Sequence, residues 1–368
     1  MTVFGTRPEV IKVAPVIRQL ESIGVETINV SSAQHRDLIQ PLIEHFDLRI
    51  DHDLDVMRPN QTLSGTSARV LNTIDPILES ERPDVVLVQG DTTTALVAAQ
   101  AAWNRRCPVG HIEAGLRSGD ATNPFPEEMN RRLISQLATF HFAATTRNQQ
   151  TLLSEGIDRN QVFVTGNPVI DALHWTLQRP RDLQDNDQID LQAIGQRIIL
   201  LTTHRRESFG DSMRANLEVM ADFVSEREDV SIVFPVHPNP AVRQAAEEIL
   251  GNRPRIHLFE PLAYPEFVVW MKRAWMLVSD SGGLQEEAPS LGKPLLVLRK
   301  NTERPEAVDC GATRLTDGSA TKLKEELTTH YLSNEWADQV RQLENPFGDG
   351  SAAERISSAL LQHAARVS

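Results

Sequence analysis

A glycine turn followed by two carboxylates is the part of the sequence whose residue types point most clearly to chemistry. Ser281-Gly282-Gly283 follows a short apolar run, residues 276–278, and Glu286 and Glu287 come next. Adjacent glycines let the backbone approach an anion closely, and the first N–H groups of a helix favour a phosphate. A carboxylate one turn into that helix can accept hydrogen bonds from both hydroxyls of a ribose. The segment therefore predicts a site for a nucleoside diphosphate.

A second candidate anion site follows the next apolar run, residues 295–298. The segment Thr302-Glu303-Arg304-Pro305-Glu306 places an arginine just after this run. The glycine turn alone could equally be an ordinary corner between a strand and a helix. Two such segments after neighbouring strands favour a ligand site instead.

Polar side chains also follow several other apolar runs of the chain. Taken singly, Asp91 could belong to a helix cap, Glu127 could be a first-turn partner of a helix dipole, and His204 could be a buried structural histidine. These separate structural explanations do not account for the recurrence of polar residues at strand ends. The recurrence favours a functional site along the edge of a sheet. The residues at such positions are Arg7, Lys12, Asp91, Glu113, Glu127, His204, Arg205 and His237.

The composition is that of a globular protein and excludes several classes of function. The 368 residues are 40% hydrophobic and 24% charged, with a formal net charge of −13. This charge disfavours a nucleic-acid groove or an anionic membrane surface as a partner. Cys107 and Cys310 are too few for a disulfide framework or a zinc site, and no signal peptide or membrane-spanning run is evident. A cytoplasmic protein is expected, and the short first strand suggests that a few upstream residues are missing.

Apolar strand-like runs alternate with amphipathic helical runs along the whole chain, which predicts an α/β protein with parallel sheets. The polar segment 179–196 interrupts this alternation and places a boundary near residues 170–190. We expect a Rossmann-like domain over residues 1–170 and a second over 171–350, facing one another across a cleft. Residues 351–368 are expected to form a terminal helix that packs back on the first domain. Ligands of such sheets bind beyond the carboxyl ends of the strands.

Nine segments together resemble the motif series of a known family, the non-hydrolysing UDP-N-acetylglucosamine 2-epimerases. They occur in the family's order and span residues 4 to about 310. The segments are FGTRPEVIKVAP, VQGDTTTALVAA, GHIEAGLRSGD, PFPEEMNRR, TGNPVIDAL, THRRESFG, VHPNP, SDSGGLQEEAPSLGKP and TERPEA. The resemblance implies a GT-B fold with UDP held mostly by the second domain, and a homodimer.

The resemblance also implies an activity and its site residues. Members interconvert UDP-N-acetylglucosamine and UDP-N-acetylmannosamine by eliminating UDP to 2-acetamidoglucal and adding it back. No metal or nicotinamide cofactor is expected. The implied acid/base carboxylates are Asp91, Glu113 and Glu127, and His204 is implied as a catalytic histidine near the diphosphate or the sugar. The implied substrate-binding residues are Arg7, Lys12, His237, Ser281, Gly282, Gly283, Glu287 and Arg304. Gln34, His35 and Arg205 match motifs associated with a regulatory UDP-N-acetylglucosamine site, which stays an open question.

Three other functions share part of this pattern. A hydrolysing epimerase would release free N-acetylmannosamine and UDP, and the complete TERPEA and THRRE segments disfavour it. A retaining GT-B glycosyltransferase would leave the three carboxylates of the first half unexplained. A non-catalytic nucleotide-sugar sensor would have no need of the acid/base residues. A role in cell-surface polysaccharide biosynthesis is expected, but the sequence leaves the pathway and the physiological direction open.

Overall fold

The computed structural model describes residues 1–32, 36–58, 61–179, 196–203 and 210–367. These residues form two compact units, which we describe separately. The first comprises Met1–His174 together with Phe347–Ser368, and the second comprises Trp175–Pro346. Most of the polar segment expected as a linker, residues 180–195, lies outside the described part of the chain.

The first unit is built on a parallel sheet of seven strands in the order β3-β2-β1-β4-β5-β6-β7. Its strands are β1 (Thr2–Phe4), β2 (Asn29–Ser31), β3 (His52–Asp53), β4 (Val86–Gln89), β5 (Val109–Ala114), β6 (Phe140–Ala143) and β7 (Val162–Val164). Its helices are α1 (Arg7–Ser22), α2 (Arg36–His45), α3 (Leu63–Glu81), α4 (Thr93–Asn104), α5 (Glu127–Leu137), α6 (Thr146–Ser154), η1 (Arg159–Gln161), α7 (Pro168–Gln178, which runs into the second unit) and α15 (Ala352–Val367). The strand order reverses between β1 and β4, where such sheets bind their ligands.

The core of the first unit explains this layering. Strand residues such as Val3 and Val88 are fully buried, as parallel strands covered on both faces must be. Helix α4 buries Ala95, Ala98 and Ala102, whose small side chains let α3 and α5 pack closely on either side.

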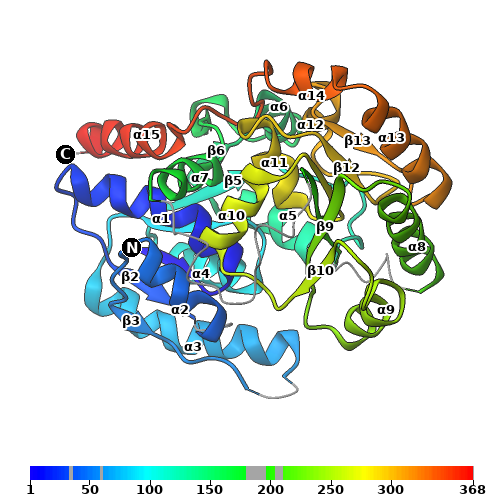
Figure 1. Ribbon diagram of the computed structural model, residues 1–368. Helices are drawn as coiled ribbons and strands as arrows, with labels where there is room; N and C mark the ends of the chain where they lie inside the picture. Colours follow the sequence, from blue (N-terminus) through cyan, green and yellow to red (C-terminus); the bar gives the residue numbers. More distant parts are fainter. Residues whose placement is uncertain (33–35, 59–60, 180–195, 204–209, 368) are drawn as a thin grey trace. The chain divides into compact units, whose positions relative to one another are not determined.

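The terminal helix α15 returns to the first unit and packs against α1 (Figure 1). Asp171 of α7 accepts hydrogen bonds from the N–H groups of Ala352 and Ala353, at 3.2 and 2.9 Å. A carboxylate at the start of a helix satisfies N–H groups that have no partner within the helix. Asp171 therefore fixes where the returning chain begins its last helix.

The second unit has a parallel sheet of six strands in the order β10-β9-β8-β11-β12-β13. Its strands are β8 (Arg197–Thr202), β9 (Val230–Pro235), β10 (Ile256–Phe259), β11 (Met276–Ser279), β12 (Leu295–Val297) and β13 (Thr313–Leu315). Its helices are α8 (Asp211–Ser225), α9 (Pro240–Leu250), α10 (Tyr264–Arg273), α11 (Gly282–Ser290), α12 (Pro305–Asp309), α13 (Ala320–Leu332) and α14 (Glu335–Val340). The order reverses between β8 and β11. The predicted α/β class with two parallel sheets is confirmed.

Candidate active site

The carboxyl edge of the first sheet gathers polar loops from three adjacent strands. Arg7 begins α1 after β1, Asp91 follows β4, and Glu113 lies near the end of β5. Because β1, β4 and β5 are neighbours, the topology brings these residues to one edge. Sequence reasoning placed them there without knowing the strand order.

Glu113 is the most constrained of these residues. Its backbone has a φ of 68°, and the pairing of β5 with β6 shifts register between Ile112 and Ala114. The side chain is buried, its Oε2 forms an ion pair with Lys12 of α1, and Asn167 donates a hydrogen bond to the same oxygen at 2.7 Å. A left-handed backbone at a non-glycine residue is costly and clusters at functional sites. Glu113 is therefore a buried carboxylate with a fixed orientation.

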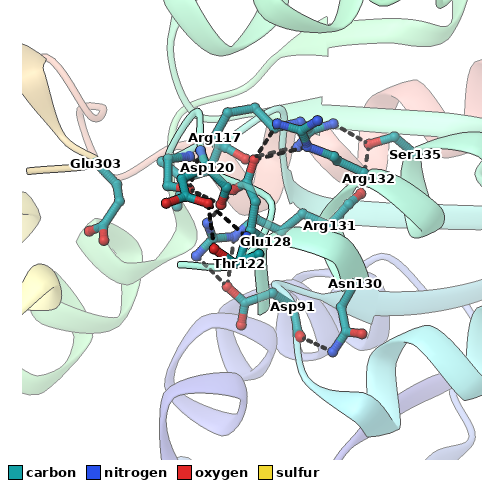
Figure 2. Close-up of polar contacts among 12 residues, drawn as sticks. Asp91, Arg117, Asp120, Thr122, Glu128, Asn130, Arg131, Arg132, Ser135 and Glu303 are labelled. Atoms are coloured by element: carbon teal, nitrogen blue, oxygen red, sulfur yellow. Dashed lines mark hydrogen bonds and ion pairs between the residues drawn. The ribbon is translucent and has the colours of Figure 1, made fainter. Parts of the chain in front are cut away.

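Asp91 is only partly buried and is held by α5. Arg131 donates to Asp91 Oδ2 from Nε at 2.8 Å and contacts it from a terminal nitrogen at 2.7 Å. Asn130 donates to the Asp91 carbonyl at 2.8 Å, so consecutive residues of α5 fix this loop (Figure 2). Both guanidinium nitrogens contact the same oxygen of Asp91, and such charge-assisted hydrogen bonds are stronger than neutral ones.

The first turn of α5 carries two glutamates with different environments. Glu128 is fully buried and accepts hydrogen bonds from Ser118 N, Arg131 and Arg132 at 2.9 to 3.1 Å (Figure 2). Burial opposes its ionisation, but these donors hold the pKa of Glu128 below its usual range. Glu127, the predicted acid/base residue, is half-buried at the start of the helix. Glu128 therefore has a structural role at the start of α5, where it binds Ser118 and two arginines. The acid/base role of Glu127 stays a prediction.

Glu9 was not predicted as a site residue, yet it organises the loop before α1. Its Oε2 accepts from the N–H groups of Gly5 and Thr6 at 3.0 and 2.7 Å, and from the Thr6 hydroxyl at 2.8 Å. Its Oε1 accepts from Thr92, the N-cap of α4, at 2.7 Å. Burial raises the pKa of Glu9, and these hydrogen bonds oppose the rise. Glu9 thereby ties the Arg7 loop to the residue after Asp91.

His111 lies in β5, two residues before Glu113, and is fully buried. Its Nε2 bonds to the carbonyl of Gly90 at 2.8 Å. Burial disfavours the imidazolium and lowers the pKa of His111 from 6.5 to about 3, although the bond to Gly90 opposes this. The neutral ring then donates from Nε2, so His111 positions the loop before Asp91 rather than transferring protons.

We expect His111 to remain neutral in the folded protein between pH 8 and pH 4. Its ring resonances should not titrate there by NMR, whereas in denaturant every imidazole should titrate near pH 6.5. The sign of the linkage follows from the lowered pKa. Its contribution to stability is fully present above pH 6.5 and falls by about 1.4 kcal/mol per pH unit below it, because only the unfolded chain binds the proton. A ring that titrates near pH 6.5 in the folded protein would contradict this assignment.

The second sheet has its own polar edge at the β8–β11 reversal. Thr202 and Ser279 share a hydrogen bond of 2.6 Å, and Thr203 donates to the buried Asp280 at 2.8 Å. Ser281 is the N-cap of α11, and its N–H bonds to the Ser279 hydroxyl at 2.9 Å. The predicted glycine turn therefore does open a helix, whose N-terminus lies at the ligand-binding edge of the sheet.

Arg304 reaches this helix start from the loop after β12. Its Nε donates to the buried Glu286 at 2.6 Å, and its backbone N–H bonds to the Thr302 hydroxyl at 3.0 Å. A Cβ placed on Gly282 would lie 2.6 Å from Nη1 of Arg304, so a side chain at this position would displace the guanidinium from the place that it occupies here. The two predicted anion segments are thus one structural unit.

Glu287 is buried and accepts a hydrogen bond from the hydroxyl of Tyr264 at 2.7 Å. Tyr264 begins α10, and the contribution of this helix to the site was not predicted from the sequence.

His237 is exposed after β9, and its Nδ1 accepts a hydrogen bond from the N–H of Asn239 at 3.2 Å. Four other predicted residues, Gln34, His35, His204 and Arg205, lie outside the described residues.

The structure brings the predicted residues together in two groups. One group, on the first unit, contains Lys12, Asp91 and Glu113. The other, on the second, contains Ser281, Gly282 and Arg304, with Glu287 on the same helix. Within the described chain, no cluster of three or more His, Cys, Asp or Glu side chains could hold a metal ion. The described helices also include none long and apolar enough to cross a membrane.

Comparison with known proteins agrees with this geometry. The family model described as UDP-N-acetylglucosamine 2-epimerase matches residues 18–361. A curated UDP-N-acetylglucosamine 2-epimerase of Yersinia pestis is 44% identical, covering 99% of this chain and 98% of its own length.

Two solved structures are similar over nearly the whole chain. The UDP-GlcNAc 2-epimerase of Neisseria meningitidis bound to UDP-GlcNAc is 41% identical, with a TM-score of 0.92 and 98% and 99% coverage. A putative UDP-N-acetylglucosamine 2-epimerase of Listeria monocytogenes is 42% identical, with a TM-score of 0.89 and 100% and 96% coverage. The GT-B-like fold is shared with these structures. The resemblance stated from the motifs is thus confirmed, and the chain is an enzyme that belongs to the UDP-N-acetylglucosamine 2-epimerase family.

Proposed function

We propose that this enzyme reversibly inverts C2 of UDP-N-acetylglucosamine to give UDP-N-acetylmannosamine without hydrolysis. The observation that carries the proposal is the pair of constrained carboxylates at one sheet edge. Glu113 is held by Lys12 and Asn167, and Asp91 is held by Arg131. Inversion of a carbon centre needs one group that removes a proton and another that returns it from the opposite face.

The chemistry explains why the leaving group must also be stabilised. The hydrogen at C2 has no neighbouring ketone and is only weakly acidic. When the C1–O bond breaks, UDP leaves with the bonding electrons and C1 becomes cation-like, so that a carboxylate can take the C2 proton. The products of this step are 2-acetamidoglucal and UDP. Protonation at C2 from the other face and return of the UDP oxygen to C1 give the epimer.

In this proposal the second unit binds the UDP. The N-terminus of α11 and the guanidinium of Arg304 would stabilise the charge that develops on the diphosphate. Glu287, oriented by Tyr264, would accept hydrogen bonds from the ribose hydroxyls. The residues of the first unit, Arg7 and Lys12 included, would act on the sugar and the departing phosphate.

A homodimer is part of the proposal. Trp103 at the end of α4 is 58% exposed, and Phe125 and Leu133, just before and within the neighbouring α5, are 70% and 46% exposed. Aromatic side chains are enriched in subunit interfaces, so these exposed residues are the candidates for one. Independence of metals and nicotinamide, a cytoplasmic location, and regulation through the motifs of Gln34, His35 and Arg205 stay predictions.

Incubation with UDP-N-acetylglucosamine in D2O tests the proposed reaction. We expect UDP-N-acetylmannosamine with deuterium at C2, seen as the loss of the C2 proton signal by NMR, because the removed proton exchanges with solvent. EDTA should leave the rate unchanged. Free N-acetylmannosamine and UDP as the main products would identify a hydrolysing enzyme instead. Unchanged substrate would refute the proposed reaction.

A further inference from the structure

Asn167 stands at the junction of three parts of the first unit. It follows β7 and directly precedes Pro168, the first residue of α7. Only 1% of its surface is exposed. Its Nδ2 donates to Glu113 Oε2 at 2.7 Å, and its Oδ1 accepts from the N–H of Val169 at 3.2 Å. Both ends of the amide are therefore engaged, and the direction of the bond to Glu113 is fixed.

The backbone of Asn167 is fixed as well. Its N–H donates to the carbonyl of Phe347 at 2.7 Å, where the chain re-enters the first unit. A Cβ on Gly166, whose φ is +84°, would lie 3.3 Å from the same Phe347 carbonyl oxygen. The two segments thus approach too closely for a larger side chain to fit easily. Asn167 connects this contact to the Glu113 carboxylate.

Lys12 and Asn167 interact with Glu113 in different ways, one mainly through its charge and the other through the direction of its hydrogen bond. An ammonium group on a flexible four-carbon chain contributes charge but little direction. An amide locked by its own second hydrogen bond contributes direction. Both donors use Oε2, whereas Oε1 lies on the Gly90 side, 3.9 Å from where a Cβ of that glycine would be. The geometry therefore holds Oε2 of Glu113 from two directions, by charge from Lys12 and by a directed hydrogen bond from Asn167.

We propose, on the basis of the proposed function, that Asn167 is a positioning residue that orients Glu113 for proton transfer at sugar C2. It does so from a backbone position anchored to the returning chain at Phe347. Asn167 does not touch the substrate. Its effect is on the alignment and the pKa of the Glu113 carboxylate, because a hydrogen bond to the ionised form favours that form.

Asn167→Ala tests this role. We expect kcat to fall about 10–100-fold, as misplacement of a reacting group by about 1 Å does. The KM for UDP-N-acetylglucosamine should change less than about twofold, because UDP contacts are unaffected. The acidic limb of the kcat–pH profile should move to higher pH, since the carboxylate loses a donor that favours its charged form. A merely structural role would not move this limb.

Asn167→Asp keeps the shape of the side chain, so it tests the positioning role even if the alanine variant does not fold. A protonated carboxyl can still donate to Glu113, whereas an ionised one repels it. Its activity relative to the wild type should therefore fall steadily as the pH rises. Activity that is independent of pH relative to the wild type would overturn the proposal.

Thr165→Val is the matched control. Thr165 is buried in the same segment, and its hydroxyl donates to the Gly166 carbonyl at 2.9 Å rather than to Glu113. Its kcat and its acidic limb should be those of the wild type. If Glu113→Gln loses turnover but both Asn167 variants keep the wild-type kcat and pH profile, the positioning role is wrong and the proposed function stands. A wild-type enzyme that does not epimerise would refute the proposed function itself.

Discussion

Glu113→Gln is expected to lower kcat by about 10²–10⁴-fold, the usual loss when a general acid or base is removed. Glutamine has nearly the same shape and can still accept hydrogen bonds from Lys12 and Asn167, but its amide cannot take a proton. UDP affinity should change less than about twofold, because the proposed UDP contacts are on the second unit. Steady-state kinetics and calorimetric titration with UDP measure the two quantities separately.

The loss of charge at Glu113 also leaves Lys12 buried without its ion-pair partner, which destabilises the fold. Combining Glu113→Gln with Lys12→Met should recover stability without recovering kcat. Glu155→Gln removes an exposed partner of Arg117 on the same unit and serves as the control, with kcat expected to be unchanged. Equal loss of UDP affinity and kcat in folded Glu113→Gln would contradict the division of roles between the two units.

Much of the fold could be predicted because parallel strands leave continuous apolar runs. The runs before Asp91, before Ser281 and before Thr302 became β4, β11 and β12. Strand β5 is less apparent in the sequence because it contains His111 and Glu113, both polar and both buried. Residues required for a site can interrupt the pattern by which a strand is recognised.

The sheet edge that carries the site could be predicted from the sequence, whereas the contacts between side chains within the site could not. Glu127 and Glu128 are adjacent and chemically identical. Glu128 is buried against the arginines only because it lies on a different face of α5 from Glu127. Asn167 and Glu113 are 54 residues apart. No periodicity connects residues across such a distance, so their pairing depends on strand order and on where α7 begins.

Glu9 shows the same limit in a different form. A carboxylate in the first turn of a helix is usually explained by the helix dipole, and that explanation would have been sufficient here. The structure shows that its second oxygen reaches Thr92, 83 residues along the chain. The local sequence pattern therefore explains the contacts of Glu9 at the start of α1, but it does not predict the contact with Thr92.

Arg304→Met is expected to lower the free energy of unfolding by about 3 kcal/mol and to weaken UDP binding about 10–100-fold. The side chain of Glu286 is 2% exposed, and removing its arginine leaves a buried charge with a lost partner. The affinity loss follows from one charged hydrogen bond to the diphosphate, worth about 1.5–3 kcal/mol. Chemical denaturation without ligand measures the first effect, and calorimetric titration with UDP measures the second.

A second substitution separates the two effects of Arg304. In Arg304→Met/Glu286→Leu both members of the buried pair are apolar, and Glu303, the other carboxylate near Arg304, keeps its ion pair with Arg299. Stability should therefore return towards the wild-type value, as it does when apolar residues replace a whole buried pair. UDP affinity should stay low, because the diphosphate still lacks its arginine. Arg341→Met, which breaks an exposed pair with Asp338 on the same unit, should change neither quantity. If the double variant bound UDP as tightly as the wild type, Arg304 would serve only to neutralise Glu286 and would not bind the diphosphate.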